Sequence, residues 1–218
     1  MAKGTNFGGW HSHRDLHLIQ QKVEVQPATP KINLVNVPGA DGSKDLSTQP
    51  AGRVVFSDRK ITWTFALYPG ENWDEKHRQV SNALNGLACE IVLDSDPDYY
   101  YDGRLTVKKY KLDGLLGQIT IEATCRPYKM KRVETKVVAE LTGTRQTLAL
   151  VNERKPVVPV VTVTAETTLF WGGSSVTVKA GTHRIADIVL QPGANLLDAR
   201  TEGGAAGEIT VAYREGAL

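Results

Sequence analysis

Apolar and polar residues alternate along most of the chain, as they do in half-buried β-strands. Between residues 60 and 67 the apolar residues occupy the odd positions, among them Trp63 and Phe65, and threonines take two of the positions between them. This segment is therefore expected to form a strand with one face in a core. The same alternation predicts further strands at residues 17–25, 31–37, 54–58, 90–93, 104–110 and 118–124.

One segment changes from a period of two residues to the period of a helix. Asn72 and Glu75 have the spacing of a capping box, in which the first side chain accepts a backbone N–H three residues further on. Val80, Leu84 and Leu87 then fall on one stripe. The pattern predicts an amphipathic helix of about 14 residues. It must pack on a sheet, because the sequence offers no second helix to cover the stripe.

The sequence after Pro127 has no helical period and reads as a series of short strands separated by Gly or Pro. Such a series is typical of a β-sandwich. The sequence therefore predicts a mainly β fold, with an α+β, β-sandwich-like N-terminal domain containing one helix at residues 1–130 and a C-terminal β-sandwich at residues 131–218. The candidate strands of the second domain are residues 134–141, 146–151, 157–163, 175–178, 182–190 and 207–213.

Composition narrows the function classes only a little. The 218 residues carry a net charge of +2, so charge does not favour a nucleic-acid or membrane partner. No apolar run approaches the roughly 20 residues of a membrane-spanning helix, and residues 1–9 are polar and glycine-rich, unlike a signal peptide. We therefore expect a protein made in a cytoplasm, with Cys89 and Cys125 as reduced core thiols and a disulfide as the alternative.

Two polar clusters invite interpretation as metal sites. His11, His13 and His17 would share one face of a strand, but alternate residues on a strand are ~6.5 Å apart, so the third imidazole is too far for one ion unless the chain bends. The acidic segment 94–98 lacks the glycine and the final glutamate of a calcium-binding loop. We expect the histidines to lie on an interface strand or a solvated strand, and segment 94–98 to form a solvated turn. No metal site is predicted.

The sequence also lacks a nucleophile elbow, a phosphate-binding loop and the spacing of a catalytic triad. No catalytic residue and no cofactor are therefore predicted, and an enzyme is not expected. The triplet 99–101 of tyrosines could stack a sugar or a base, although packing at a strand edge is the more usual role. An alternative function is a carbohydrate-binding module for host cell-wall polysaccharide, using Trp171 or these tyrosines.

The segment from Pro38 to Gly52 holds fifteen residues with little apolar content. A loop of this length inside a compact domain is usually functional or flexible. It is either a hairpin tip without fixed structure or an arm that becomes ordered against a neighbouring subunit.

Several phrases of the sequence, in their order, resemble the bacteriophage distal tail (Dit) proteins, a family also found in prophages. Residues 38–42 are similar to the family's Pro-Gly-x-Asp-Gly turn, and the single helix after Trp73 follows where the family has it. The resemblance covers nearly the whole chain. The other similar phrases are Thr5–Trp10, Tyr99–Leu105, Ile119–Tyr128 with its final Cys-Arg-Pro-Tyr, Leu190–Asn195 and Ile209–Arg214.

The resemblance implies a structural protein whose N-terminal domain forms a homo-hexameric ring around a channel, with a galectin-like C-terminal β-sandwich facing outward. Such a ring joins the tail tube to the tail-associated hub protein and the receptor-binding apparatus of the virion tail, and DNA passes through it without specific binding. Another ring-forming tail tube or baseplate protein is the alternative. The resemblance favours the arm, with subunit contacts at Asp41, Gly42, Lys44, Asp45 and Leu46.

Overall fold

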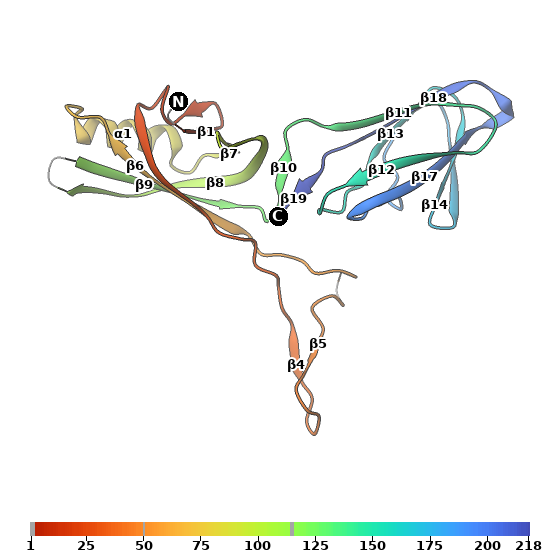
Figure 1. Cartoon of the computed structure of the whole chain (residues 1–218), viewed down its shortest axis with the longest axis horizontal. Helices are drawn as coiled ribbons and strands as arrows, with labels where there is room; N and C mark the ends of the chain where they lie inside the picture. The colour runs from red at the N-terminus through yellow and green to blue at the C-terminus, as the bar shows by residue number, and fades with distance from the viewer. Residues whose placement is uncertain (1–2, 50, 114–115) are drawn as a thin grey trace. The chain divides into compact units, whose positions relative to one another are not determined.

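The computed structural model describes residues 3–49, 51–113 and 116–218. The contacts within the chain divide it into two compact units, which are Met1–Lys129 together with Leu218, and Met130–Ala217 (Figure 1). Strands make up most of both units, so the mainly β fold class is confirmed. Within the described part of the chain, no helix has the length and apolar character needed to span a membrane.

The first unit is built on an antiparallel sheet with the strand path β2-β1-β7-β8-β9-β6-β3. The strands predicted at 17–25, 60–67, 90–93, 104–110 and 118–124 all belong to it, whereas 54–58 forms only an isolated bridge at Phe56. The strands of this path are β1 (Thr5–Phe7), β2 (Trp10–His11), β3 (Leu18–Val25), β6 (Arg59–Leu67), β7 (Ala88–Leu93), β8 (Asp96–Asp113) and β9 (Leu116–Cys125).

The helix α1 (Trp73–Leu84) packs its apolar stripe on this sheet. Asn72 Oδ1 accepts a hydrogen bond of 3.1 Å from the backbone N–H of Glu75, which is the cap that the spacing predicts. Val80 and Leu84 are fully buried. The predicted helix is confirmed, although it has 12 residues and ends at Leu84.

Three aromatic rings form the centre of the first core. Trp63 and Phe65 come from β6 and Phe7 comes from β1, and all three side chains are fully buried. The ring of Phe7 meets that of Trp63 edge to face, with 5.0 Å between the centroids, and that of Phe65 at 6.3 Å. Edge-to-face pairs add to the free energy gained from burying the rings. Phe7 thereby ties the start of the chain to β6, a strand far from β1 in the order of the sheet.

The two cysteines lie on either side of a glycine in the same row of the sheet. Cys89 pairs with Gly103, and Gly103 pairs with Cys125. A Cβ at Gly103 would lie 2.5 Å from Cys125 Sγ, so the thiol occupies the space that the glycine leaves open. Strands two places apart are about 9.5 Å apart, and a disulfide requires the Cα atoms within ~7 Å. The geometry therefore favours two free thiols.

Both thiols should react slowly in the native protein. Burial raises the pKa of Cys89 to about 11 and that of Cys125 to about 12. Since the thiolate is the nucleophile, alkylation of the native protein at about pH 8 should be on the order of a hundredfold slower than in guanidinium chloride. The rate should rise about tenfold per pH unit up to about pH 11. Mass spectrometry of iodoacetamide adducts measures this, and a disulfide-linked species would contradict it.

The second unit is a sandwich of two four-stranded antiparallel sheets around one apolar core. One sheet has the order β11-β18-β13-β16 and the other β12-β17-β14-β15. Strand β10 (Lys129–Lys131) begins at the boundary between the units. The elements that follow it are β11 (Thr135–Leu141), β12 (Gln146–Asn152), β13 (Val160–Val163), β14 (Thr167–Trp171), β15 (Ser174–Val178), β16 (Gly181–His183), β17 (Gly193–Thr201), the 3-10 helix η1 (Glu202–Gly204), β18 (Gly207–Tyr213) and β19 (Gly216–Ala217).

In the sandwich, one predicted strand is wrong and two strands are present that were not predicted. Residues 182–190 were expected to form one strand, but β16 ends at His183 and the chain turns before an isolated bridge at Leu190. Strands β14 and β17 lie in segments without a predicted strand. Both occupy the interior of their sheet, where both neighbours supply hydrogen bonds to the backbone, so their pairing depends on residues far away in the sequence.

An ion pair holds the two ends of the second unit together. Glu215 near the C-terminus is buried, and its carboxylate accepts hydrogen bonds from Lys131 Nζ at 2.8 Å and from Thr135 Oγ1 at 2.6 Å. The hydrogen bond to Glu215 raises the pKa of Lys131 above its usual value. A buried carboxylate is tolerated because both of these donors compensate for its lost hydration.

Candidate functional site: an exposed hairpin arm

The segment 31–46 forms a hairpin that makes a two-stranded sheet of its own. Strand β4 (Leu34–Asn36) pairs with β5 (Ser43–Asp45) (Figure 1). In this pairing, Val35 lies opposite Lys44. The connecting turn contains Gly39 and Gly42 with φ of 80° and 72°, a conformation that favours glycine. Part of the polar loop predicted from Pro38 onward is therefore a strand, and residue 50 lies outside the described residues.

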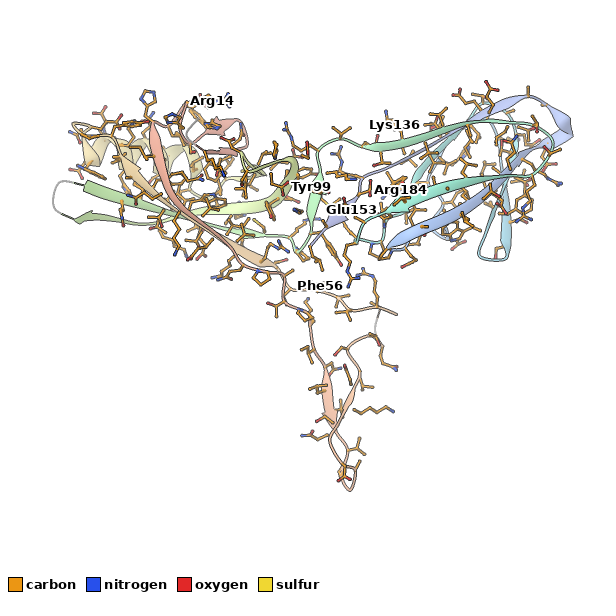
Figure 2. All side chains as sticks on the ribbon, in the orientation of Figure 1. Arg14, Phe56, Tyr99, Lys136, Glu153 and Arg184 are labelled. Atoms are coloured by element: carbon orange, nitrogen blue, oxygen red, sulfur yellow. The ribbon has the colours of Figure 1, made fainter. Side chains whose placement is uncertain are left out.

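A short ladder attaches this hairpin to the rest of the first unit. The backbone N–H of Lys31 donates to Val55 O at 2.8 Å, and that of Ser57 donates to Thr29 O at 2.8 Å. Phe56, labelled in Figure 2, packs its ring edge to face on Tyr128 with 5.9 Å between the centroids. The base of the hairpin is thus anchored. We call residues 31–46 the hairpin arm.

The hairpin arm exposes apolar side chains that no core covers. Every residue from 31 to 45 is exposed, including Ile32 at 66%, Leu34 at 57%, Val35 at 40% and Val37 at 45%. Isolated two-stranded hairpins are only marginally stable in water, and exposed apolar clusters of this kind usually mark an interaction surface. The strand predicted at 31–37 exists at its centre, but no core in the described part of the chain covers its apolar side chains.

The five predicted contact residues lie on the other half of the hairpin arm. Asp41 and Gly42 belong to the turn, Lys44 and Asp45 to β5, and Leu46 follows β5. Asp45 Oδ1 accepts a hydrogen bond of 2.8 Å from the backbone N–H of Ser47, and hydrogen bonding to Ser47 lowers the pKa of Asp45. Asp45 therefore shapes the strand end. The contact role of all five residues stays a prediction.

The exposure of the apolar residues in segment 31–37 was not predicted, because their strand pattern was interpreted as a sign of burial. Leu34, Val35 and Val37 put apolar side chains on both faces of one short strand, between Pro30 and Pro38. A strand that is apolar on both faces must be covered on both. The neighbouring sequence offers no segment that could cover both faces. The pattern could therefore have been used to predict that a partner outside the chain covers this strand.

The three histidines near the start of the chain contact different groups. His11 is buried, and its Nδ1 accepts two backbone N–H groups, so its Nε2–H donates to Asp94 at 3.2 Å. His13 stacks on a tyrosine ring, and His17 lies 3.8 Å from a glutamate. Among the residues that the structure describes, no three metal-ligating side chains come together.

The acidic turn and the tyrosines are also used within the fold. The turn predicted at 94–98 is confined to its first two residues, because β8 already begins at Asp96. The Asp96 carboxylate accepts a hydrogen bond of 2.7 Å from Lys129 Nζ, which also lies 4.4 Å from the ring centroid of Tyr99. Tyr101 is only 6% exposed. Packing within the first unit therefore accounts for Tyr99 and Tyr101.

Both units of the chain take part in a similarity to a solved structure. The crystal structure of the Dit protein of phage SPP1 is similar with a TM-score of 0.68 at 13% sequence identity, over 98% of this chain and 99% of that chain. This chain has the fold of a phage Dit protein. The resemblance seen in the sequence is thereby confirmed at the level of the fold. Neither a protein-family model nor a curated protein sequence matches the chain.

The extent of the Dit similarity matters as much as its score. Coverage of nearly all of both chains means that the similarity includes the first unit with its hairpin arm as well as the second unit. That SPP1 protein is described as a paradigm of hub adsorption apparatus in phages that infect Gram-positive bacteria.

Proposed function

We propose that this chain is a structural component of a phage tail tip, in which six copies form a closed ring. The hairpin arm carries the proposal. It presents uncovered apolar side chains on a chain with the Dit fold, and a ring subunit needs such an element. Contacts in a closed ring are heterologous, so each subunit offers one patch and receives a different one. The hairpin arm supplies the offered patch.

We also propose a place for the ring in the tail, which the Dit fold supports. As part of a hub, it would join the tail tube on one side to the tail-associated hub protein and the receptor-binding apparatus on the other. DNA would pass through the ring, and the net charge of +2 suits passage without tight phosphate contacts. The protein would be made in the bacterial host cytoplasm and end in the virion tail.

The mass of the purified protein in solution tests this proposal. Light scattering should give six times the chain mass of 23.8 kDa, and negative-stain images should show single six-fold rings with a central hole. Rings that stack into long tubes would instead indicate a tail tube protein. A monomer at the highest soluble concentration, with no rings in the images, would contradict the proposal.

A further inference from the structure

The sandwich of the second unit contains a pocket that the proposed ring does not use. It opens between the β14–β15 hairpin and the segment that follows β16, with a volume of about 250 Å³. Leu169 and Ile188 form its buried apolar lining, and the half-buried Trp171 is part of its wall. Exposed polar groups complete it, namely Ser174, Ser175 and Asp187.

Two polar side chains of this pocket make no polar contact within the described part of the protein. In the described part of the chain, neither the indole of Trp171 nor the carboxylate of Asp187 has a hydrogen-bond or ion-pair partner. Trp171 nevertheless packs against the buried core of the sandwich, which holds the indole in place. An aromatic side chain packed on the core and a carboxylate without a partner therefore line the same small space beside an apolar lining.

We propose that this pocket binds one neutral pyranose ring of a polysaccharide. A pyranose has an apolar C–H face that can lie on an aromatic ring and hydroxyl groups that can donate to a carboxylate. The volume corresponds to about eight water molecules at ~30 Å³ each, which suits a single sugar ring. Asp187 would repel the carboxylate of an acidic sugar, so the site favours a neutral one.

An apolar side chain of a partner protein fits the same pocket less well. It would cover the lining, but it would also take water from the Asp187 carboxylate without replacing that hydrogen bond. A sugar hydroxyl can donate to this carboxylate. The polar rim therefore favours a polyol over a purely apolar ligand.

One sugar ring in an open pocket binds weakly, with a dissociation constant on the order of millimolar. Should the six-membered ring of the proposed function form, six such pockets on one particle would strengthen attachment to a repeating polysaccharide without any new contact. The pyranose site itself does not depend on the ring.

Saturation-transfer NMR on the full-length protein tests the site. Glucose, galactose and N-acetylglucosamine are the probes, and glycerol is the control for non-specific polyol binding. At least one hexose should give a saturable signal in the millimolar range. Asp187→Asn and Trp171→Leu should each weaken that signal at least tenfold. Trp10→Ala changes a tryptophan of the first unit that is 44% exposed, and it should leave the signal unchanged.

Each other outcome counts against the proposal. The absence of a hexose signal in the parent protein would overturn it, and so would equal signals from the parent and from Asp187→Asn. Binding of an indole or leucine amide probe in place of the sugars would indicate a pocket for a protein side chain. Asp187→Asn alters only an exposed carboxylate, so it keeps the test valid if Trp171→Leu unfolds. Ring formation by Asp187→Asn, measured separately, distinguishes failure of this site from failure of the hub.

Discussion

A variant with Ile32, Leu34 and Val35 all changed to serine should fold as the parent does and should fail to form rings. The three side chains are 66%, 57% and 40% exposed and touch no core, so the free energy of unfolding should change by less than about 0.5 kcal/mol. In a ring, they are expected to become buried against the neighbouring subunit. Burial of one such side chain contributes roughly 1.5–3 kcal/mol.

The loss of three buried side chains at each contact is therefore large. Even partial burial of all three contributes about 4 kcal/mol, which corresponds to a thousandfold weaker contact. Because a closed ring repeats that contact at every subunit, the hexamer should be replaced by monomer. Light scattering at matched concentrations measures the change in mass, and circular dichroism establishes that the fold is retained.

The chain offers a matched control for this variant. Val138, Val151 and Leu196 in the second unit are 57%, 62% and 64% exposed, so changing all three to serine removes a similar apolar surface elsewhere. That control should keep the mass of the parent. Loss of rings in the control alone, or rings in the variant of the hairpin arm, would place the subunit contact outside the arm.

The same hairpin illustrates what a single sequence can and cannot predict. Alternation identifies which residues share a face, and this was enough to place the strand around Trp63 and the capped helix after Asn72. It does not say whether anything covers that face. Segment 31–37 has a strand pattern, as does the segment that contains Trp63, yet its apolar side chains are exposed. Whether a strand face is covered depends on partners that are far away in the sequence or belong to another chain.

The pocket in the second unit could not be predicted from the local sequence pattern, for a related reason. Trp171 stood out by residue type alone, but Asp187 lies in a segment that was expected to be a continuous strand, which would have placed it in a sheet. Its position beside Trp171 follows from the end of β16 at His183 and from the pairing of strands far apart in the sequence. Such long-range pairing decides the site, and periodicity carries no information on it.

Gly117→Ala should be the most destabilising small substitution in the first unit. A Cβ at Gly117 would lie 1.7 Å from Cζ3 and 1.8 Å from Cη2 of Trp73, the first residue of α1. The indole therefore lies directly on the glycine of β9. Since the ring is partly buried against the core, it cannot move away without losing that packing. Overpacking of this kind costs about 1–3 kcal/mol.

Backbone conformation cannot explain such a loss, because Gly117 is in extended strand geometry and does not have the positive φ of a turn glycine. Without the clash, alanine in place of glycine stabilises a protein by about 0.4–1 kcal/mol, since it restricts the unfolded chain. The sign of the effect should therefore depend on Trp73. In a Trp73→Ala background, Gly117→Ala should be neutral or stabilising.

A double-mutant cycle of Gly117→Ala and Trp73→Ala, followed by urea denaturation, measures this dependence as a coupling free energy of about 1.5–3 kcal/mol. Equal destabilisation in both backgrounds would mean that the indole is not what excludes the methyl group. A large coupling would establish that the helix is fixed to the sheet by this contact at its first residue. The remainder of the helix would then be oriented by Val80 and Leu84, which lie about two and about three turns further along and are fully buried.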